Sequence, residues 1–148
     1  PCIAQVVGAY EEHSAMVMVG VQAVPETELC RVGTAAGASM ADRVYRCTAY
    51  VEKPSIDIAR AKLRTSGVAE GQYLGHCGIY VFPPVIFDCL REVDSTRATG
   101  GELELSGAQE LLLERVSESY LLYHISGQGL DVGSPAGYAN AQKVFSSC

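Results

Sequence analysis

The stretch VYRCTAYVEKP, which runs from Val44 to Pro54, determines how the rest of the sequence is interpreted. Its first eight residues alternate between two sets of side chains, and a period of two residues predicts a β-strand. The strand is followed by a carboxylate, an ammonium group and a rigid proline, at Glu52, Lys53 and Pro54. Ligands of open α/β sheets bind beyond the carboxyl ends of the strands, so these residues mark a candidate binding site.

Helical and extended patterns alternate along the rest of the chain. We expect helices within residues 2–14, 83–93, 106–116 and 134–145, strands at residues 16–24, 73–82 and 120–125, and a loop at residues 25–43. The strand at 16–24 is almost continuously apolar, as is typical of a strand buried on both faces. The alternation predicts an α/β fold, a mixed, mostly parallel sheet with flanking helices, in a single domain spanning residues 1–148.

Two of the expected helices begin with capping signals. Ser106 is followed three positions later by Gln109, which predicts a capping box. Ser134 is the expected N-cap of the last helix, with Pro135 at the first helical position.

The composition excludes several classes of function. The formal net charge is −6, from 11 basic and 17 acidic residues, and no basic run is present, which argues against nucleic acid as a partner. No apolar run approaches the ~18 residues of a membrane span. The six cysteines have no metal-binding spacing, so we expect reduced thiols in a cytoplasmic protein.

Glu52 and Lys53 have two possible interpretations. On an extended backbone adjacent side chains point to opposite faces, so we expect no ion pair between them. A carboxylate accepts hydrogen bonds from sugar hydroxyls, and an ammonium group is a compact charge for a phosphate, which together would bind a small anionic polyol. The alternative is a solvated polar strand end.

Three further positions are open to two interpretations each. Asp131 is either a ligand for Mg²⁺ or a turn aspartate near the N-terminus of the last helix. Gly75 and Gly78 either let a ligand approach the backbone or mark a β-bulge. His76 lies between these two glycines, and it is the histidine most closely associated with the candidate site.

Taken in order, a set of short motifs resembles a known family. The motifs are AYEE, VP, RVG, VEKP, GIYVFPPVIFDCL, GELELS and DVGSPAGY. Their combination resembles the sugar-1-phosphate nucleotidylyltransferases, in particular the bacterial UTP–glucose-1-phosphate uridylyltransferases, over nearly the whole chain. The resemblance implies a partial Rossmann-like nucleotidyltransferase fold. It also implies a Mg²⁺-dependent transfer of a uridylyl group from UTP to glucose 1-phosphate, which gives UDP-glucose and pyrophosphate.

The resemblance also implies roles for individual residues. Glu52 would bind hexose hydroxyls, and Lys53 would neutralise the sugar phosphate. Gly78 and Tyr80 would line the sugar pocket, and Gly33 would offer a backbone contact to the sugar. The resemblance assigns no catalytic residue among these.

Other consequences concern the metal and the departures from the family pattern. Asp131 would be one of two aspartates that hold Mg²⁺. Gly107 stands where relatives often have an aspartate, and the loop at residues 64–72 is longer than the common pattern.

The glycine-rich G-G-x-G-T-R loop of the family and its first metal-binding aspartate are missing from this sequence. The chain therefore resembles the C-terminal, sugar-phosphate-binding portion of such an enzyme, without the N-terminal nucleotide-binding portion. We expect this portion to be inactive alone and to bind a sugar 1-phosphate and a nucleotide sugar. We also expect it to form a homo-oligomer through an exposed sheet edge and an exposed apolar face. The alternative is a non-catalytic sugar-phosphate-binding or structural module.

Overall fold

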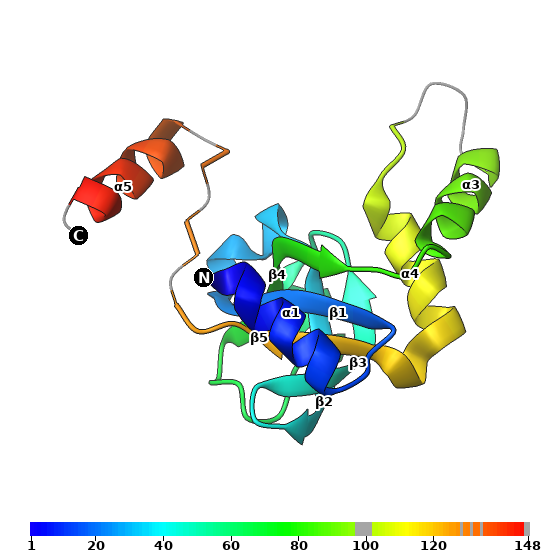
Figure 1. Cartoon of the computed structure of the whole chain (residues 1–148). Coiled ribbons are helices and arrows are strands. Elements are labelled where there is room, and N and C mark those ends of the chain that lie inside the picture. Colours follow the sequence, from blue (N-terminus) through cyan, green and yellow to red (C-terminus); the bar gives the residue numbers. More distant parts are fainter. Residues whose placement is uncertain (97–101, 128, 131, 134, 147–148) are drawn as a thin grey trace.

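The computed structural model describes residues 1–96, 102–127, 129–130, 132–133 and 135–146. Its described strands form a closed five-stranded barrel (Figure 1). The strands are β1 (Val17–Pro25), β2 (Thr34–Ala41), β3 (Val44–Val51), β4 (Gln72–Val81) and β5 (Tyr120–His124). The described helices are α1 (Cys2–Glu12), α2 (Ile56–Lys62), α3 (Ile86–Thr96), α4 (Leu105–Val116) and α5 (Pro135–Ser146), with short 3₁₀ turns η1 (Glu26–Arg31) and η2 (Ser117–Ser119).

The expected α/β fold with a mixed sheet and flanking helices is confirmed, but the expected predominance of parallel pairing is wrong. The strand order is β1-β4-β2-β3-β5, and among the described strands only β1 and β5 pair in parallel. The difference arises from a hairpin. β2 and β3 are joined by the two-residue turn Asp42-Arg43, which allows antiparallel pairing only.

β2 lies in the segment that the sequence predicts to be a loop. Its residues are mostly Ala, Gly and Ser, which have low strand propensity, so the pattern gives no strand signal. The strand forms because it pairs with β3 on one side and β4 on the other. α2 was also missed; Ser55 caps it by accepting a hydrogen bond from the Ile58 backbone N–H at 3.3 Å.

The expected exposed sheet edge is absent from the described strands. β1 pairs with β4 on one side and β5 on the other, and β5 also pairs with β3, so the barrel closes. Each of the five strands thus has two neighbours, which leaves no strand unpaired along a whole side, although β2 and β4 pair only at Thr34–Gly75 and Ala35–Leu74.

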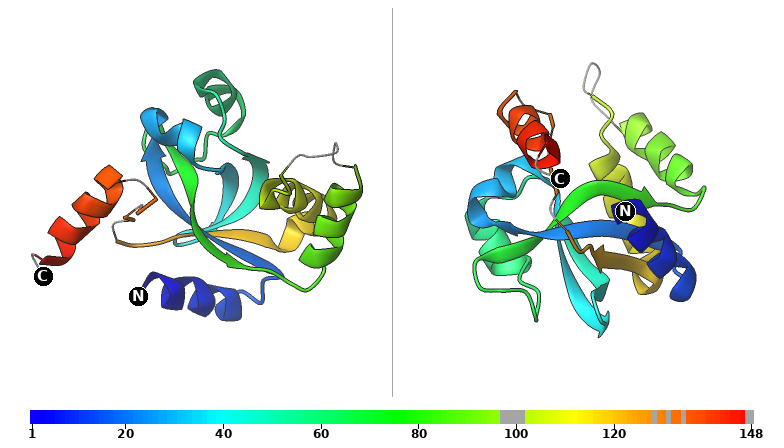
Figure 2. Two further views of the ribbon diagram at one scale, coloured as in Figure 1. Left: turned by 90° about the horizontal axis from the view of Figure 1, so that it is seen from above. Right: turned by 60° about the vertical axis from the view of Figure 1, so that its left-hand side comes forward.

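Helices α1, α3 and α4 pack against the outside of the barrel. α3 and α4 pack together at one end of the barrel, α1 lies along another side, and α5 stands apart (Figures 1 and 2). As expected, β1 is buried on both faces. Val17, Val19 and Val21 belong to the cluster that includes Leu112 of α4, whereas Met18 belongs to the cluster beneath α1.

The capping box expected at the start of α4 does not form. Ser106 donates to the Glu104 carboxylate at 3.3 Å, and the helix has no side-chain cap. Gln109 is buried and accepts a hydrogen bond from the Tyr120 hydroxyl at 3.2 Å, because its side chain faces β5 and not the helix start. The other expected cap, Ser134, lies outside the described residues, while α5 does begin at Pro135.

Two bulk expectations can be compared with the described residues. No described helix has the length and apolar character needed to cross a membrane. The five described cysteines are free thiols, and Cys148 lies outside the described part of the chain.

A pair of glycine substitutions tests the β2–β3 register. A Cβ atom at Gly37 would lie 2.6 Å from the Cβ of Tyr45 and 3.1 Å from the Arg46 carbonyl oxygen. We expect Gly37→Ala to lower the free energy of unfolding by about 1–3 kcal/mol through overpacking. Gly8→Ala is the matched control, because that helical site has no atom within 4 Å of an added Cβ, and it should stabilise α1 by about 0.5–1 kcal/mol. Urea unfolding measures the free energy of unfolding of both variants, which should fall for Gly37→Ala and rise for Gly8→Ala. The same change in both variants would contradict the β2–β3 register.

Candidate functional site

The candidate site begins at the turn that connects β3 to α2. Glu52 and Lys53 follow the last residue of β3, and Ser55 caps the helix that comes next. Lys53 has a φ angle of +45°, in the left-handed region that non-glycine residues rarely occupy. This conformation costs roughly 1–2 kcal/mol, and such strain is concentrated at functional sites. The turn is therefore the first structural indication of a site.

Glu52 is anchored on both of its oxygens. The Tyr50 hydroxyl donates to Glu52 Oε2 at 2.6 Å, as expected for side chains two residues apart on one face of a strand end. Lys53 Nζ lies 3.6 Å from Glu52 Oε1, so the prediction that these two residues form no ion pair is wrong. The prediction assumed an extended backbone, and the left-handed turn at Lys53 removes that condition.

Gly33 closes the site against Tyr50 and Glu52. A Cβ atom at Gly33 would lie 2.6 Å from the Tyr50 hydroxyl oxygen and 2.7 Å from Glu52 Oε2. The Gly33 carbonyl accepts a hydrogen bond from the backbone N–H of His76 at 2.8 Å, which ties this residue to β4. Only a residue without a side chain fits at position 33 while the Tyr50–Glu52 hydrogen bond is kept.

An aromatic column continues from Tyr50 along β4. The rings of Tyr50 and His76 are stacked, with centroids 4.7 Å apart and an interplanar angle of 16°. His76 meets the edge of Tyr80 at 5.8 Å, and Tyr80 stacks on Phe82 at 5.3 Å. These four rings bring Tyr80 into the same site as Glu52, and the Glu52 charge contributes, after burial, to a raised pKa of the Tyr80 hydroxyl.

Burial controls the protonation states in this column. It raises the pKa of the Tyr50 hydroxyl, and the hydrogen bond to Glu52 raises it further, so Tyr50 stays a donor. Burial lowers the pKa of His76 to about 4, which keeps the imidazole neutral at physiological pH. His76 is only 9% exposed, and neither ring nitrogen has a hydrogen-bond partner. Each unpaired nitrogen costs about 1–3 kcal/mol.

Gly78 lies in an irregularity of β4. The β1–β4 register shifts between Val19, which pairs with Tyr80, and Val21, which pairs with His76. Gly78 therefore lies in a β-bulge, which is one of its two predicted interpretations. Gly78 has a φ angle of +77°, and no atom lies within 4 Å of the position of an added Cβ. The bulge thus leaves open space beside the backbone near Tyr80.

A cavity of about 390 Å³ lies next to Glu52. The residues that line it come from the β3 end, α3, α4 and the segment before α4: Glu52, Val93, Thr96, Glu102, Glu104, Ser106, Gly107 and Glu110. Burial, followed by the charges of Glu114 and Glu52, raises the pKa of Glu110. Gly107 lines this cavity together with four glutamates.

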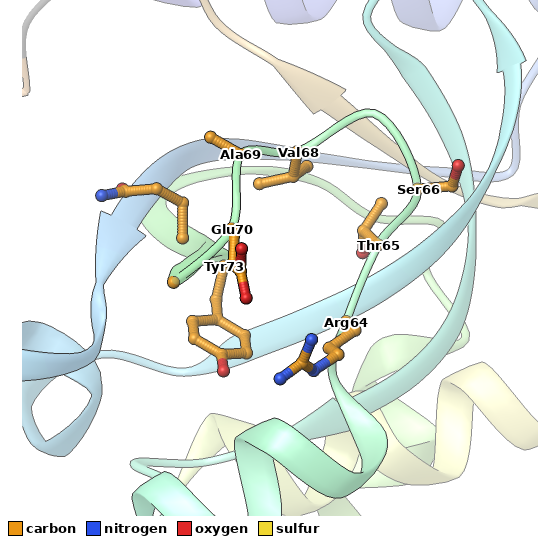
Figure 3. Close-up of a pocket in the computed structure, with 9 residues that line it drawn as sticks. Arg64, Thr65, Ser66, Val68, Ala69, Glu70 and Tyr73 are labelled. Carbon is orange, nitrogen blue, oxygen red and sulfur yellow. The ribbon is translucent and has the colours of Figure 1, made fainter.

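The loop at residues 64–72, which the resemblance predicts to be longer than the family pattern, lies at a separate cavity. Residues 64–66 and 68–73, with Gly71 included, line a volume of about 320 Å³ (Figure 3). Thr65 is buried and anchors the loop by accepting a hydrogen bond from the Gly37 backbone N–H at 3.1 Å. The two cavities share no lining residue, so the longer loop does not form a wall of the cavity next to Glu52.

The expected metal ligand cannot be placed. Asp131 lies outside the described residues. The described part of the chain brings together no group of three or more His, Cys, Asp or Glu side chains with the geometry to hold a metal ion.

The structure brings together Gly33, Glu52 and Tyr80, with Lys53 paired to Glu52. Sequence reasoning missed Tyr50, although its position two residues before Glu52 on a strand was a usable signal. It also missed Glu110. This carboxylate lines the same cavity as Glu52 because α4 packs near the end of β3, and no local sequence pattern indicates that packing.

The buried histidine predicts a specific pH dependence of stability. Because the pKa of His76 falls from about 6.5 in the unfolded chain to about 4 in the folded protein, the unfolded chain binds the additional proton between these values. Stability should therefore fall as the pH drops from 6.5 to 4, by at most roughly 3 kcal/mol, and this contribution should level off below pH 4. The non-titrating variant His76→Leu should lose this part of the slope in urea unfolding at each pH. Parallel pH profiles of the two proteins would contradict the buried neutral imidazole.

Comparisons with known proteins identify the relatives of this chain. No model of a protein family matches the sequence. The UTP–glucose-1-phosphate uridylyltransferase of Pseudomonas aeruginosa is 28% identical over 137 residues, which are 93% of this chain and 43% of the relative. UTP–glucose-1-phosphate uridylyltransferase 2 of Staphylococcus saprophyticus is 33% identical over 138 residues, which are 93% of this chain and 42% of the relative. The chain thus spans less than half the length of these curated relatives.

Solved structures give the same result for the fold. A UDP-glucose pyrophosphorylase complexed with UDP-glucose matches 97% of this chain and 48% of its own, with a TM-score of 0.73 and 22% identity. The apo form of a UDP-glucose pyrophosphorylase matches 99% of this chain and 48% of its own, with a TM-score of 0.76 and 21% identity. The resemblance to the sugar-1-phosphate nucleotidylyltransferases is therefore confirmed, since this chain is homologous over 93% of its length to part of the UTP–glucose-1-phosphate uridylyltransferases.

Proposed function

We propose that this chain is the sugar-phosphate-binding part of a UTP–glucose-1-phosphate uridylyltransferase. The parent enzyme would transfer a uridylyl group from UTP to glucose 1-phosphate and release pyrophosphate. The observation that carries the proposal is the pair Glu52 and Lys53, placed at a left-handed turn with Glu52 anchored by Tyr50. The family relationship gives this arrangement a substrate class.

The two charged groups would bind different ends of glucose 1-phosphate. The Glu52 carboxylate accepts hydrogen bonds, so it suits the hexose hydroxyls. The Lys53 ammonium group suits the phosphate. Its side chain is 54% exposed, and an exposed ion pair such as the one with Glu52 contributes only about 0–1 kcal/mol. A phosphate with two negative charges can therefore displace Glu52 from Lys53 at small cost.

The surrounding residues would shape the sugar pocket. The bulge at Gly78 leaves space for a ligand to approach the backbone, and Tyr80 follows two residues later on β4. Gly33 is buried directly against the Tyr50 hydroxyl and the Glu52 carboxylate, so its backbone lies beside the group proposed to bind the sugar. The open space at Gly78 supports the proposed roles of Gly78 and Tyr80 as sugar contacts, whereas the proposed backbone contact of Gly33 rests on the family resemblance.

The transfer itself is proposed for the whole parent enzyme. Phosphoryl-group transfer depends on positioning and on neutralisation of the phosphate charge, and this chain spans less than half of its relatives. Mg²⁺ would supply much of that neutralisation, and Asp131 is proposed as one of its ligands. We propose that the chain alone binds sugar phosphate and nucleotide sugar in the cytoplasm without turnover.

Titration calorimetry with glucose 1-phosphate, with and without Mg²⁺, tests the proposed site. We expect Lys53→Ala to weaken binding by roughly tenfold or more, because the phosphate loses its neighbouring cation. Lys62→Ala is the matched control, since it removes an exposed lysine from α2, away from the site. UDP-glucose should likewise bind more weakly to Lys53→Ala than to the wild-type chain or to Lys62→Ala.

Two outcomes of this titration would overturn the proposal. Equal affinity of the wild-type chain and Lys53→Ala would show that Lys53 does not contact the phosphate. No binding of either ligand by the wild-type chain would favour the alternative, a structural module without a sugar-phosphate site.

A homo-oligomer is also proposed, and α5 now supports it in place of a sheet edge. Tyr138 and Phe145 on this helix are 55% and 73% exposed, and Val132 before it is 59% exposed. Exposed apolar side chains that are grouped in this way favour association. Light scattering should give a mass above the 15.8 kDa of one chain, and Phe145→Ser should lower it. A monomer at all concentrations would contradict this proposal.

A further inference from the structure

We propose that His76 is a positioning residue of the sugar-phosphate site, which holds the Tyr50 ring and thereby the Glu52 carboxylate. The inference rests on the proposed function for its ligand. Its structural part, the control of Tyr50 by His76, concerns the free protein and can be tested without a ligand.

The first argument is the geometry of the slot that Tyr50 occupies. One side of the slot is the Gly33 backbone, since a Cβ there would lie 2.6 Å from the Tyr50 hydroxyl oxygen and 2.8 Å from Tyr50 Cε2. Another side is the His76 ring, stacked on Tyr50 at a centroid distance of 4.7 Å. The backbone hydrogen bond of 2.8 Å between His76 and Gly33 fixes the separation of these two residues.

The second argument is that His76 does not serve the stability of the fold. Its ring is buried, and its two nitrogens are the only fully buried side-chain polar atoms without a partner in the described part of the chain. An apolar side chain of similar volume would avoid this penalty. The imidazole ring is flat and small enough to stack on Tyr50 in this slot. A phenyl ring is larger, and a leucine side chain is not flat.

The consequence concerns the direction of the Glu52 carboxylate. Tyr50 is its only hydrogen-bond donor within the described residues, at 2.6 Å, apart from the exposed ion pair with Lys53. If Lys53 binds a phosphate and leaves Glu52, the hydrogen bond from the Tyr50 hydroxyl alone fixes the orientation of the Glu52 carboxylate. His76 therefore controls sugar binding through Tyr50 without touching the sugar.

The test uses the Tyr50 hydroxyl proton as its spectroscopic signature. A hydroxyl bonded to a carboxylate and shielded from water exchanges slowly, so its proton should give a resolved NMR signal that Tyr50→Phe removes. We expect His76→Leu to abolish this signal while its melting temperature stays equal or rises, because two unpaired nitrogens are removed. Phe82→Leu is the matched control at the other end of the column and should keep the signal.

Binding of glucose 1-phosphate provides the second readout. We expect His76→Leu to lower its affinity roughly tenfold or more. His76→Phe, which crowds the slot, should lower both signal and affinity and serves as the second variant if His76→Leu does not fold. A retained hydroxyl signal in either folded variant would overturn the positioning role. If the wild-type chain shows the signal but binds no glucose 1-phosphate, the proposed function fails, and the positioning role is still decided by the signal.

Discussion

The parallel pairing of β1 with β5 is the constraint on which the structure depends. It joins the first and last strands of the described sheet and closes the barrel, with five residue pairs from Val17–Tyr120 to Val21–His124. β1 can occupy this position because it is apolar on both faces. One face packs on α1, and the other packs on the core shared with α3 and α4. Closure then sets the relative positions of β2, β3 and β4, which supply the candidate site.

The site gains its rigidity from three separate strands. Gly33 precedes β2, Tyr50 is on β3 and His76 is on β4. The pairing of β2 with both β3 and β4 brings these three residues together, and the left-handed turn at Lys53 is imposed where β3 leaves the barrel. A site that draws on several strands of a closed sheet is held more firmly than one built on a single loop.

The sequence predicts the parts of this structure that have strong local patterns. These patterns are the apolar run of β1, the alternation in β3 and the helical spacing of α1, whereas α4 was predicted from a capping box that does not form. β2 was missed because small residues carry no strand signal, and without β2 the hairpin and barrel closure could not be foreseen. For the site, the EKP motif located Glu52 and Lys53. The positioning role that we propose for His76 depends on stacking between residues of two different strands, which no local pattern encodes.

The distribution of charge favours one orientation of the proposed ligand. The cavity beside Glu52 is lined by three more glutamates, from the segment before α4 and from α4 itself, and burial raises the pKa of one of them, Glu110. Carboxylates accept hydrogen bonds from neutral hydroxyls but repel a phosphate. Lys53 is exposed on the turn beside this cavity. A bound glucose 1-phosphate would therefore point its hydroxyls toward the glutamates and its phosphate toward Lys53.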